Sequence, residues 1–253
     1  MELVEEKTGD VDQVQRLKLV ARRLGLLNHG REYQNRCRML FDGINLKGKS
    51  MLEIGCGKGL LCLWAKIHGA SDVVGLEPLA QGAYDSSQCY SDFKTIVTEL
   101  GLENIDIVPS RLEDYRPANR TFDVVLSLAS INHLDETSCI ELRQSETARA
   151  NYVSLFNHVR DLMSPGGTLI VVDASSNSFF GDLHLTNPFN PHIEWFKHQR
   201  PEIWAQLLSR CRFSNPKISW LSGSLLGHIG VPTIPKTLSY FLSSAFRLEM
   251  DCT

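Results

Sequence analysis

Three glycines at alternate positions, Gly55, Gly57 and Gly59, interrupt the stretch MLEIGCGKGLL. A short apolar run precedes them and predicts a buried strand, and an apolar segment compatible with a helix follows. Glycine adopts backbone conformations that side chains disfavour, and it lets a ligand approach the chain closely. A turn of this kind fits the carboxyl edge of a parallel sheet, where proteins with such sheets bind their ligands.

The rest of the chain alternates in the same way and predicts an α/β fold. Apolar, β-branched runs that alternate with helices are typical of a doubly wound, mostly parallel sheet with helices on both faces. Strands are predicted over 50–55, 72–78, 104–110, 121–130, 167–175, 217–222 and 243–250, the fifth being introduced by the turn SPGG. Helices are predicted over 10–27 with Asp10 at the N-cap, 31–42, 59–70, 90–102, 135–163 as one helix or two, and 202–211.

Composition limits the class of protein. The 253 residues suit one α/β domain with insertions or two small domains, and the net charge of −3 argues against a general nucleic-acid binder. The seven cysteines are scattered without a CxxC pair, which favours free thiols over a disulfide framework or a zinc site. The polar N-terminal stretch is no signal peptide, and no apolar run approaches the ~20 residues of a membrane span, so we expect a cytoplasmic protein.

The glycine spacing distinguishes between two kinds of nucleotide site. A dinucleotide loop requires G-x-G-x-x-G, and the position of its third glycine is occupied here by Leu60. The observed pattern is E-x-G-x-G-x-G, with Glu53 two residues before the first glycine. In this context it resembles the first motif of the class I S-adenosylmethionine-dependent methyltransferases, Rossmann-like enzymes of the small-molecule type.

Four further features extend the resemblance in the order that the family has them. Glu77 ends the second predicted strand, 18 positions after Gly59. The loop PSRLEDY follows the third strand, FDVVLSLASINHL matches the motif of the fourth, and LMSPGGTLIVVD matches the segment that leads into the fifth. The resemblance therefore implies a seven-stranded sheet with its last strand antiparallel. It also implies an N-terminal helical cap or lid over 1–45 and a Rossmann-like domain over 46–253, with a substrate-side insertion around 176–240.

The resemblance assigns S-adenosylmethionine as the cofactor and implies a role for each matching residue. The family's acid before the loop helps to hold the cofactor's ammonium group, the acid after the second strand binds the ribose, and the loop after the third strand covers the adenine. Carried over to this chain, the cofactor contacts are Glu53, Gly55, Cys56, Gly57, Gly59, Glu77, Leu112, Glu113 and Ser127. Each acid also has an ordinary interpretation: Glu53 as a carboxylate satisfied by backbone N–H groups, Glu77 as a helix N-terminal charge, and Glu113 as a solvated loop residue.

The acceptor side is less defined. His133 follows the fourth strand, where the family places substrate-facing residues, and a neutral imidazole can take a hydroxyl proton near pH 7. We therefore predict His133 as the catalytic base and Asn132 as an acceptor contact, with a capping or packing histidine as the alternative. The segment after the fifth strand is rich in histidine and aromatic residues, and it is either a structured loop or an acceptor-binding segment through His192, Trp195 and His198. Its spacing matches no closed metal site, so no metal is predicted.

A lid role for the second N-terminal helix is open as well. If this helix is a lid, Tyr33 and Arg38 close over the cofactor. If it is not, they pack against the edge of the sheet.

These features predict methyl transfer to a small-molecule acceptor, with a hydroxyl of a metabolite, sugar or lipid-linked glycan as the expected group. A nicotinamide-dependent oxidoreductase is the alternative that Leu60 opposes, and a silent binding protein is opposed by the intact glycines and Glu77. A nucleic-acid methyltransferase gains support from the basic helix around 16–23 and loses it from the acidic total. Its usual NPPY-type tetrapeptide for amino methylation of bases is replaced by SLAS. The partner is thus a small molecule.

Overall fold

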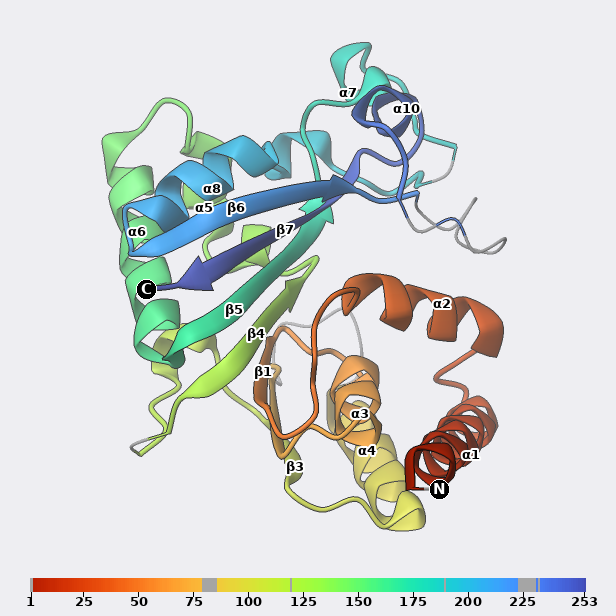
Figure 1. The fold of residues 1–253 in the computed structure, drawn as a ribbon. Coiled ribbons are helices and arrows are strands. Elements are labelled where there is room, and N and C mark those ends of the chain that lie inside the picture. The colour runs from red at the N-terminus through yellow and green to blue at the C-terminus, as the bar shows by residue number, and fades with distance from the viewer. Residues whose placement is uncertain (1, 79–85, 119, 189, 223–230, 232) are drawn as a thin grey trace. The chain divides into compact units, whose positions relative to one another are not determined.

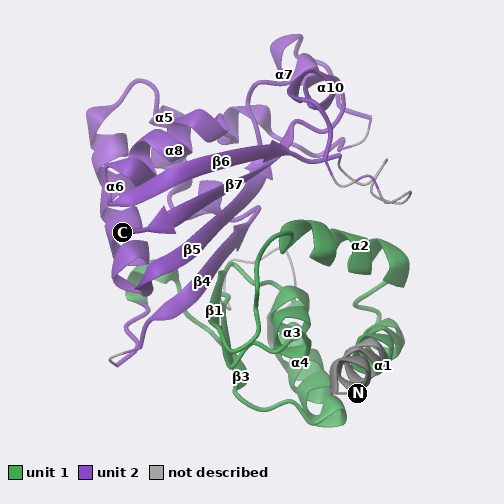
Figure 2. Cartoon of the chain, in the orientation of Figure 1, with its two compact units in different colours: residues 1–114 green, residues 115–253 purple. Residues whose placement is uncertain are grey.

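The computed structural model of the chain describes residues 2–78, 86–118, 120–188, 190–222, 231 and 233–253. Strands and helices alternate along the sequence (Figure 1). The residues fall into two units, 1–114 and 115–253 (Figure 2). The division of the chain into an N-terminal cap over 1–45 and a following domain stays a prediction.

Seven strands form the sheet in the order β3-β2-β1-β4-β5-β7-β6, which confirms the predicted fold class. The strands are β1 (Ser50–Ile54), β2 (Asp72–Leu76), β3 (Ile105–Val108), β4 (Phe122–Leu128), β5 (Met163–Ala174), β6 (Phe213–Trp220) and β7 (Ala245–Cys252). The last strand is antiparallel to both of its neighbours, β5 and β6. β1, β2 and β3 pair in parallel, as do β4 and β5.

In the first unit, helices surround the three parallel strands. The helices are α1 (Glu2–Arg23), α2 (Gly30–Leu40), α3 (Leu60–Ile67), α4 (Ser86–Leu100) and the short η1 (Leu112–Asp114). α3 packs against all three strands, and α1 packs against α3 and α4. Leu52, Leu63, Phe93 and Ile96 are fully buried in this core. Burying each such side chain stabilises the unit by roughly 1.5–3 kcal/mol.

In the second unit, α6 and α8 contact each other and the sheet, α6 through β5 and α8 through β6 and β7. Tyr152 of α6 lies 5.0 Å from Trp204 of α8 between ring centroids, and both side chains are fully buried. The helices are η2 (Ile131–His133), α5 (Glu136–Glu141), α6 (Glu146–Asp161), α7 (Phe179–Asp182), η3 (Trp195–Lys197), α8 (Pro201–Ser209) and α10 (Lys236–Phe241).

The predicted helical region 135–163 is two helices because each has its own N-cap. The Asp135 carboxylate accepts a hydrogen bond from the Ser138 N–H at 2.9 Å and starts α5. The Ser145 hydroxyl accepts one from the Ala148 N–H at 3.2 Å and starts α6. A cap contributes about 1 kcal/mol and fixes where a helix begins.

Two predictions about element boundaries were wrong. α1 begins at Glu2, so Asp10 lies inside the helix and is not its N-cap. The SPGG sequence does not form a turn before the fifth strand but lies within β5, where the pairing register with β4 shifts. Gly166 has a φ of +76° in this irregular part, so the glycine allows a local bend without ending the strand.

The predicted insertion 176–240 contains α7, η3, α8 and α10 as well as β6, while 223–230 and 232 lie outside the described residues. α7 and α10 contact each other (Figure 1). Their contact is aromatic: the Phe179 ring lies 5.3 Å from that of Phe241 and 6.3 Å from that of Tyr240. No described helix is long and apolar enough to cross a membrane.

Gly59 and Gly57 provide a matched test of the packing around the glycine turn. Both have positive φ, but a Cβ at Gly59 would lie 2.6 Å from Phe93 Cδ2 and 2.8 Å from Ile107 Cδ1, whereas one at Gly57 would have no atom within 4 Å. We expect Gly57→Ala to lower the free energy of unfolding by about 1–2 kcal/mol, through the backbone conformation alone. Gly59→Ala should lower it by about 2–5 kcal/mol, because overpacking adds to that cost. Urea denaturation of both variants checks this, and equal losses would contradict the packing argument.

Candidate active site

The glycine turn joins the end of β1 to the start of α3, as predicted. Gly55, Gly57 and Gly59 have φ values of +70°, +53° and +68°, which a residue with a side chain rarely adopts. The N–H groups of Gly55 and Cys56 both donate to the Leu76 carbonyl oxygen at 2.9 Å. The turn is therefore fastened to the end of β2 by its own backbone.

Glu77 follows β2 directly and reaches the glycine turn. Its Oε2 accepts a hydrogen bond from the Gly57 N–H at 2.8 Å, and its own N–H donates to the Val108 carbonyl oxygen at 3.2 Å. The structure thus brings together the two features that the sequence placed in one site, the glycines and the acid 18 positions later. No described residue forms a further hydrogen bond with Oε1 of this carboxylate.

Glu53 is the second acid beside the turn, and it is 2% exposed at the end of β1. Burial raises the pKa of its carboxyl group to about 8, although the hydrogen bond from Cys62 and the charge of Arg36 act in the opposite direction. The Cys62 thiol donates to Glu53 Oε2 at 3.0 Å. Sequence reasoning named Glu53 but missed Cys62 and Arg36, because neither lies in the glycine motif.

The packing of Cys56 and Cys62 depends on a third position. A Cβ added to Gly75 in β2 would lie 2.5 Å from Cys56 Sγ and 3.0 Å from Cys62 Sγ. The two thiols therefore lie side by side against a strand residue without a side chain. The hydrogen bond between the two thiols raises the pKa of Cys62 and acts in the opposite direction on Cys56, and burial and nearby carboxylate charge raise the pKa of both. Both thiols are therefore protonated near pH 7 and unsuited to act as nucleophiles.

α2 packs against the first turn of α3. The Tyr33 hydroxyl donates to the Leu60 carbonyl oxygen at 2.7 Å, and its ring meets the Trp64 ring edge-on at 5.9 Å. Tyr33 is therefore a packing residue of this unit in the structure. η1 carries two further predicted residues: Leu112 is buried, and Glu113 forms an ion pair with Arg111 at 3.2 Å.

In the second unit, the predicted residues at the end of β4 and directly after it lie in a short polar segment. Ser127 is buried, and its hydroxyl is 2.8 Å from that of Ser130. Asn132 is also buried, and its Oδ1 has no hydrogen-bond partner among the described residues. His133 is 57% exposed, with Nδ1 3.2 Å from Glu136 Oε2. A hydrogen bond from Lys197 is the main reason why the pKa of Glu136 is lowered.

The histidine-rich segment places its three predicted residues differently. His192 is exposed, and Trp195 covers Gly181 of α7, where an added Cβ would lie 3.0 Å from its ring. His198 is 14% exposed, and its Nδ1 lies 3.1 Å from Oδ1 of Asp173, which is 1% exposed. No group of three His, Cys, Asp or Glu among the described residues could hold a metal ion.

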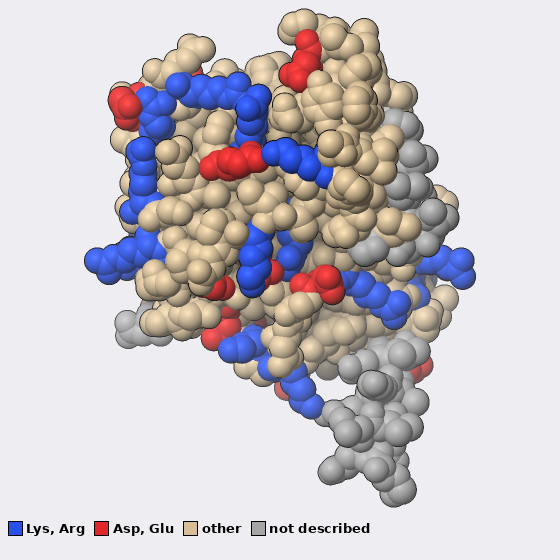
Figure 3. Space-filling model, turned by 45° about the horizontal axis from the view of Figure 1, so that its top comes forward, with Lys and Arg blue, Asp and Glu red and all other residues tan. Residues whose placement is uncertain are grey.

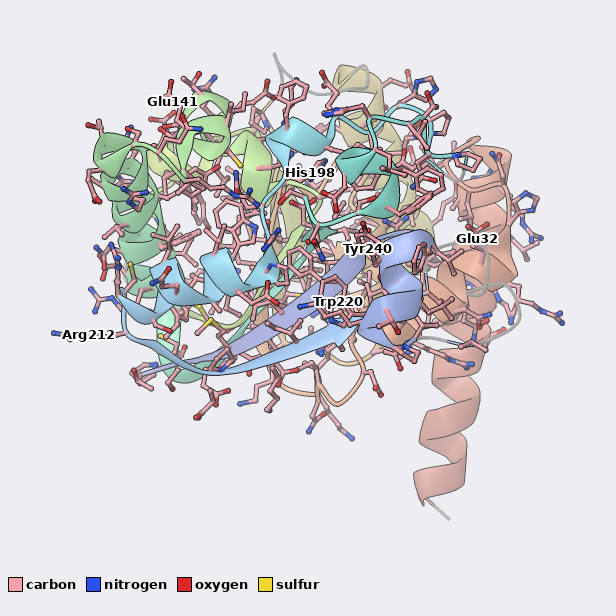
Figure 4. All side chains as sticks on the ribbon, turned by 90° about the horizontal axis from the view of Figure 1, so that it is seen from above. Glu32, Glu141, His198, Arg212, Trp220 and Tyr240 are labelled. Carbon is pink, nitrogen blue, oxygen red and sulfur yellow. The ribbon has the colours of Figure 1, made fainter. Side chains whose placement is uncertain are left out.

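In the second unit, sequence reasoning missed Asp173. It lies near the carboxyl end of β5, and its Oδ1 also accepts a hydrogen bond from the Ala174 N–H at 2.8 Å. Its Oδ2 is buried without a hydrogen-bond partner among the described residues. The available signal was an acid at the end of the apolar run LIVVD. Because an aspartate is rarely buried unless it is paired, such a position indicates a polar partner elsewhere in the chain. Figure 4 labels His198 on the segment that precedes α8.

The comparison with protein families matches most of the chain. A model described as a methyltransferase domain matches residues 27–228. The chain is 33% identical over 110 residues to the ubiquinone biosynthesis O-methyltransferase of Azorhizobium caulinodans, covering 44% of this chain and 40% of that protein. It is 32% identical over 127 residues to the tRNA U34 carboxymethyltransferase of Desulfotalea psychrophila, covering 50% of this chain and 33% of that protein. The chain thus spans between a third and two fifths of these relatives.

Solved structures share the fold at low sequence identity. An S-adenosylmethionine-dependent methyltransferase from Mesorhizobium loti has a TM-score of 0.57 at 16% identity, covering 87% of this chain and 97% of that chain. The magnesium protoporphyrin IX methyltransferase from Synechocystis, solved with bound S-adenosylmethionine, has a TM-score of 0.51 at 15% identity, covering 87% and 78%. The chain belongs to the methyltransferase domain family.

Proposed function

We propose that this chain methylates a hydroxyl group of a small-molecule acceptor, which binds to the second unit. The observation that carries the proposal is the pairing of His198 with the buried Asp173 carboxylate at 3.1 Å. A hydroxyl acceptor has to lose a proton, and an imidazole held by a carboxylate is suited to bind and orient such a group. The likeness to a ubiquinone biosynthesis O-methyltransferase supports transfer to oxygen.

The residues of the first unit fit the cofactor. The glycine turn leaves open space at Gly57, and two carboxylates, Glu53 and Glu77, lie beside it. Bound S-adenosylmethionine would supply a methyl group on a sulfonium, whose transfer to oxygen leaves S-adenosylhomocysteine. Glu77 would accept hydrogen bonds from the ribose hydroxyls, and Glu53 would pair with the ammonium group. Leu112 would offer an apolar contact to the adenine, and Glu113, released from Arg111, would accept from its amino group.

In the second unit we assign a proton-accepting role to His133 and an acceptor-binding role to His198. Both imidazoles have a carboxylate on Nδ1, Glu136 for His133 and Asp173 for His198. A carboxylate at Nδ1 holds the proton there and leaves Nε2 as the basic nitrogen. His133 is the more exposed of the two and can exchange its proton with water after each turnover. Asn132, with its unpartnered Oδ1, would accept a hydrogen bond from the acceptor.

Nucleic acid is the second candidate acceptor, because three of the matched relatives are tRNA U34 carboxymethyltransferases. The first unit gathers cations around Lys18, whose pKa is lowered by burial and by the nearby charges of Arg22 and Arg38. The net charge of −3 opposes this candidate. A screen for S-adenosylhomocysteine release with metabolite pools and with total tRNA distinguishes the two, and release with tRNA alone would overturn the small-molecule proposal.

Glu77→Ala should weaken S-adenosylhomocysteine binding by more than tenfold. The substitution removes two hydrogen bonds to a charged group, each contributing roughly 1.5–3 kcal/mol. It also removes the acceptor of the Gly57 N–H. Isothermal titration calorimetry checks the affinity. Glu103→Ala is the matched control, because this exposed acid precedes β3 and should leave the affinity unchanged. Wild-type affinity in Glu77→Ala would contradict the role of this carboxylate.

Binding of S-adenosylhomocysteine at pH 7 should release close to one proton from Glu53. With a pKa of about 8 the carboxyl group is mostly protonated in the free protein. Pairing with the ligand's ammonium group favours the ionised form and lowers that pKa, so the proton leaves. Calorimetry in buffers of different ionisation enthalpy counts the protons.

The matched control for this measurement is Glu53→Gln, which should release none. The release in the wild type should also fade as the pH rises above about 8, where the free protein has already lost the proton. A release that persists unchanged in Glu53→Gln would assign it to another group.

His133→Ala should keep cofactor affinity and lower turnover by roughly 10²–10⁴-fold, because a general base contributes about that factor. His198→Ala should mainly raise the KM for the acceptor found in the screen. Steady-state kinetics of both variants separate the two roles. Full turnover in His133→Ala together with a collapse of kcat in His198→Ala would transfer the role of base to His198.

A further inference from the structure

A cavity of about 440 Å³ lies within the second unit, outside the residues assigned above. Its walls come from the segment between α5 and α6, the start of α6, the segment after β5, α8 and the residue before it, the end of β6 and the start of α10. This volume falls in the range of roughly 300–1,000 Å³ that is typical of small-molecule sites. It is large enough for part of a metabolite.

The charge of the cavity is opposite to that of the chain. Arg143, Arg149, Arg200 and Lys236 line it, and Glu202 is the one acid among the described lining residues. The whole chain has 26 Lys and Arg residues against 29 Asp and Glu residues. Figure 3 shows basic side chains spread over this face, with acidic ones beside several of them. A cavity with this balance of charge attracts an anion.

Two of the four cations form no ion pair with a described residue, although the charge of Arg200 does act on the neighbouring Glu202. Arg149 pairs with Glu146 at 2.6 Å and Lys236 with Glu202 at 2.7 Å. The Arg143 guanidinium donates to the Ser176 hydroxyl at 3.0 Å, and it forms no ion pair with a described residue. Arg200 directly precedes α8 and likewise lies in no ion pair within the part of the chain that the structure describes.

Trp220 gives the cavity a rigid wall. Its ring packs against that of Phe246 with ring centroids 6.4 Å apart, and Lys236 Nζ lies 5.2 Å from the centroid of the Trp220 ring. A half-buried indole beside arginines combines an apolar surface with groups that bind anions. The wall also provides a fluorescent reporter of whatever enters.

Two segments that line the cavity also carry the proposed acceptor-binding pair close by in sequence. Arg200 follows His198 by two residues, and the lining residue Ser175 follows Asp173 by two. An acceptor whose hydroxyl contacts His198 can therefore extend its remainder into the cavity. Two guanidinium groups without an ion pair match a dianion better than a single carboxylate.

We propose that this cavity binds the phosphomonoester or pyrophosphate group of a small-molecule methyl acceptor, through Arg143 and Arg200. The inference rests on the proposed function for the identity of the acceptor, but the anion site exists independently of methyl transfer. An RNA backbone is the competing ligand, and it would engage phosphodiesters along a surface rather than one terminal group.

The first test is titration of the full chain with inorganic pyrophosphate, followed by tryptophan fluorescence and by calorimetry. We expect saturable binding, a fluorescence change that disappears in Trp220→Phe, and affinity that is lowered about tenfold or more in Arg143→Gln and in Arg200→Gln. Arg212→Gln is the matched control and should bind like the wild type. Arg212 precedes β6 and Trp220 ends it, so the two lie roughly 25 Å apart at opposite ends of the strand (Figure 4).

Three outcomes would overturn the proposal: no pyrophosphate binding to the wild type, an equal loss in Arg212→Gln, or stronger competition by a short RNA oligonucleotide than by ribose 5-phosphate. S-adenosylhomocysteine affinity is measured on the same variants and should not change. If pyrophosphate binds as expected but no small molecule, phosphorylated or not, accepts a methyl group, the anion site stands and the proposed function fails. If a metabolite is methylated equally well with and without its phosphate, the cavity does not serve the acceptor.

Discussion

The site in the first unit depends on one carbonyl oxygen, that of Leu76, which accepts the N–H groups of both Gly55 and Cys56. This double hydrogen bond fixes the glycine turn to the end of β2. The turn is therefore held next to Glu77, the acid that directly follows this strand. Two buried contacts support it, the close packing of Gly59 on Phe93 and of Gly75 on the two thiols. A cofactor then meets a turn whose backbone is already in place.

The sequence predicted the fold class and the glycine turn well, because both are recorded in local patterns. Apolar runs, turn glycines and the spacing to Glu77 are short-range signals, and they located the strands and the turn to within a few residues. The N-terminal start of α1 was missed, since Gly9 and Asp10 resemble a helix boundary. The SPGG segment was misplaced because its glycines and proline are as compatible with a bulge in β5 as with a turn.

The acceptor side was only partly predictable for a physical reason. Asp173 and His198 are 25 positions apart, and only the folded chain brings the carboxylate to the imidazole. Arg143 and Arg200 are further apart still and line the same cavity. Such residues belong to no motif, and their function depends on burial and partners that a sequence does not state. The net negative charge of the chain gave no sign of an anion site. Such a total does not show that several cations line one cavity.

The carboxylate of Glu77 uses one oxygen to hold the Gly57 N–H, while the described residues form no hydrogen bond with the other. A ribose can therefore join this carboxylate without displacing the group that it already binds. Nothing in the turn has to open, refold or change partner before the nucleoside is seated. The glycine turn itself should then add no slow rearrangement to the association of the nucleoside.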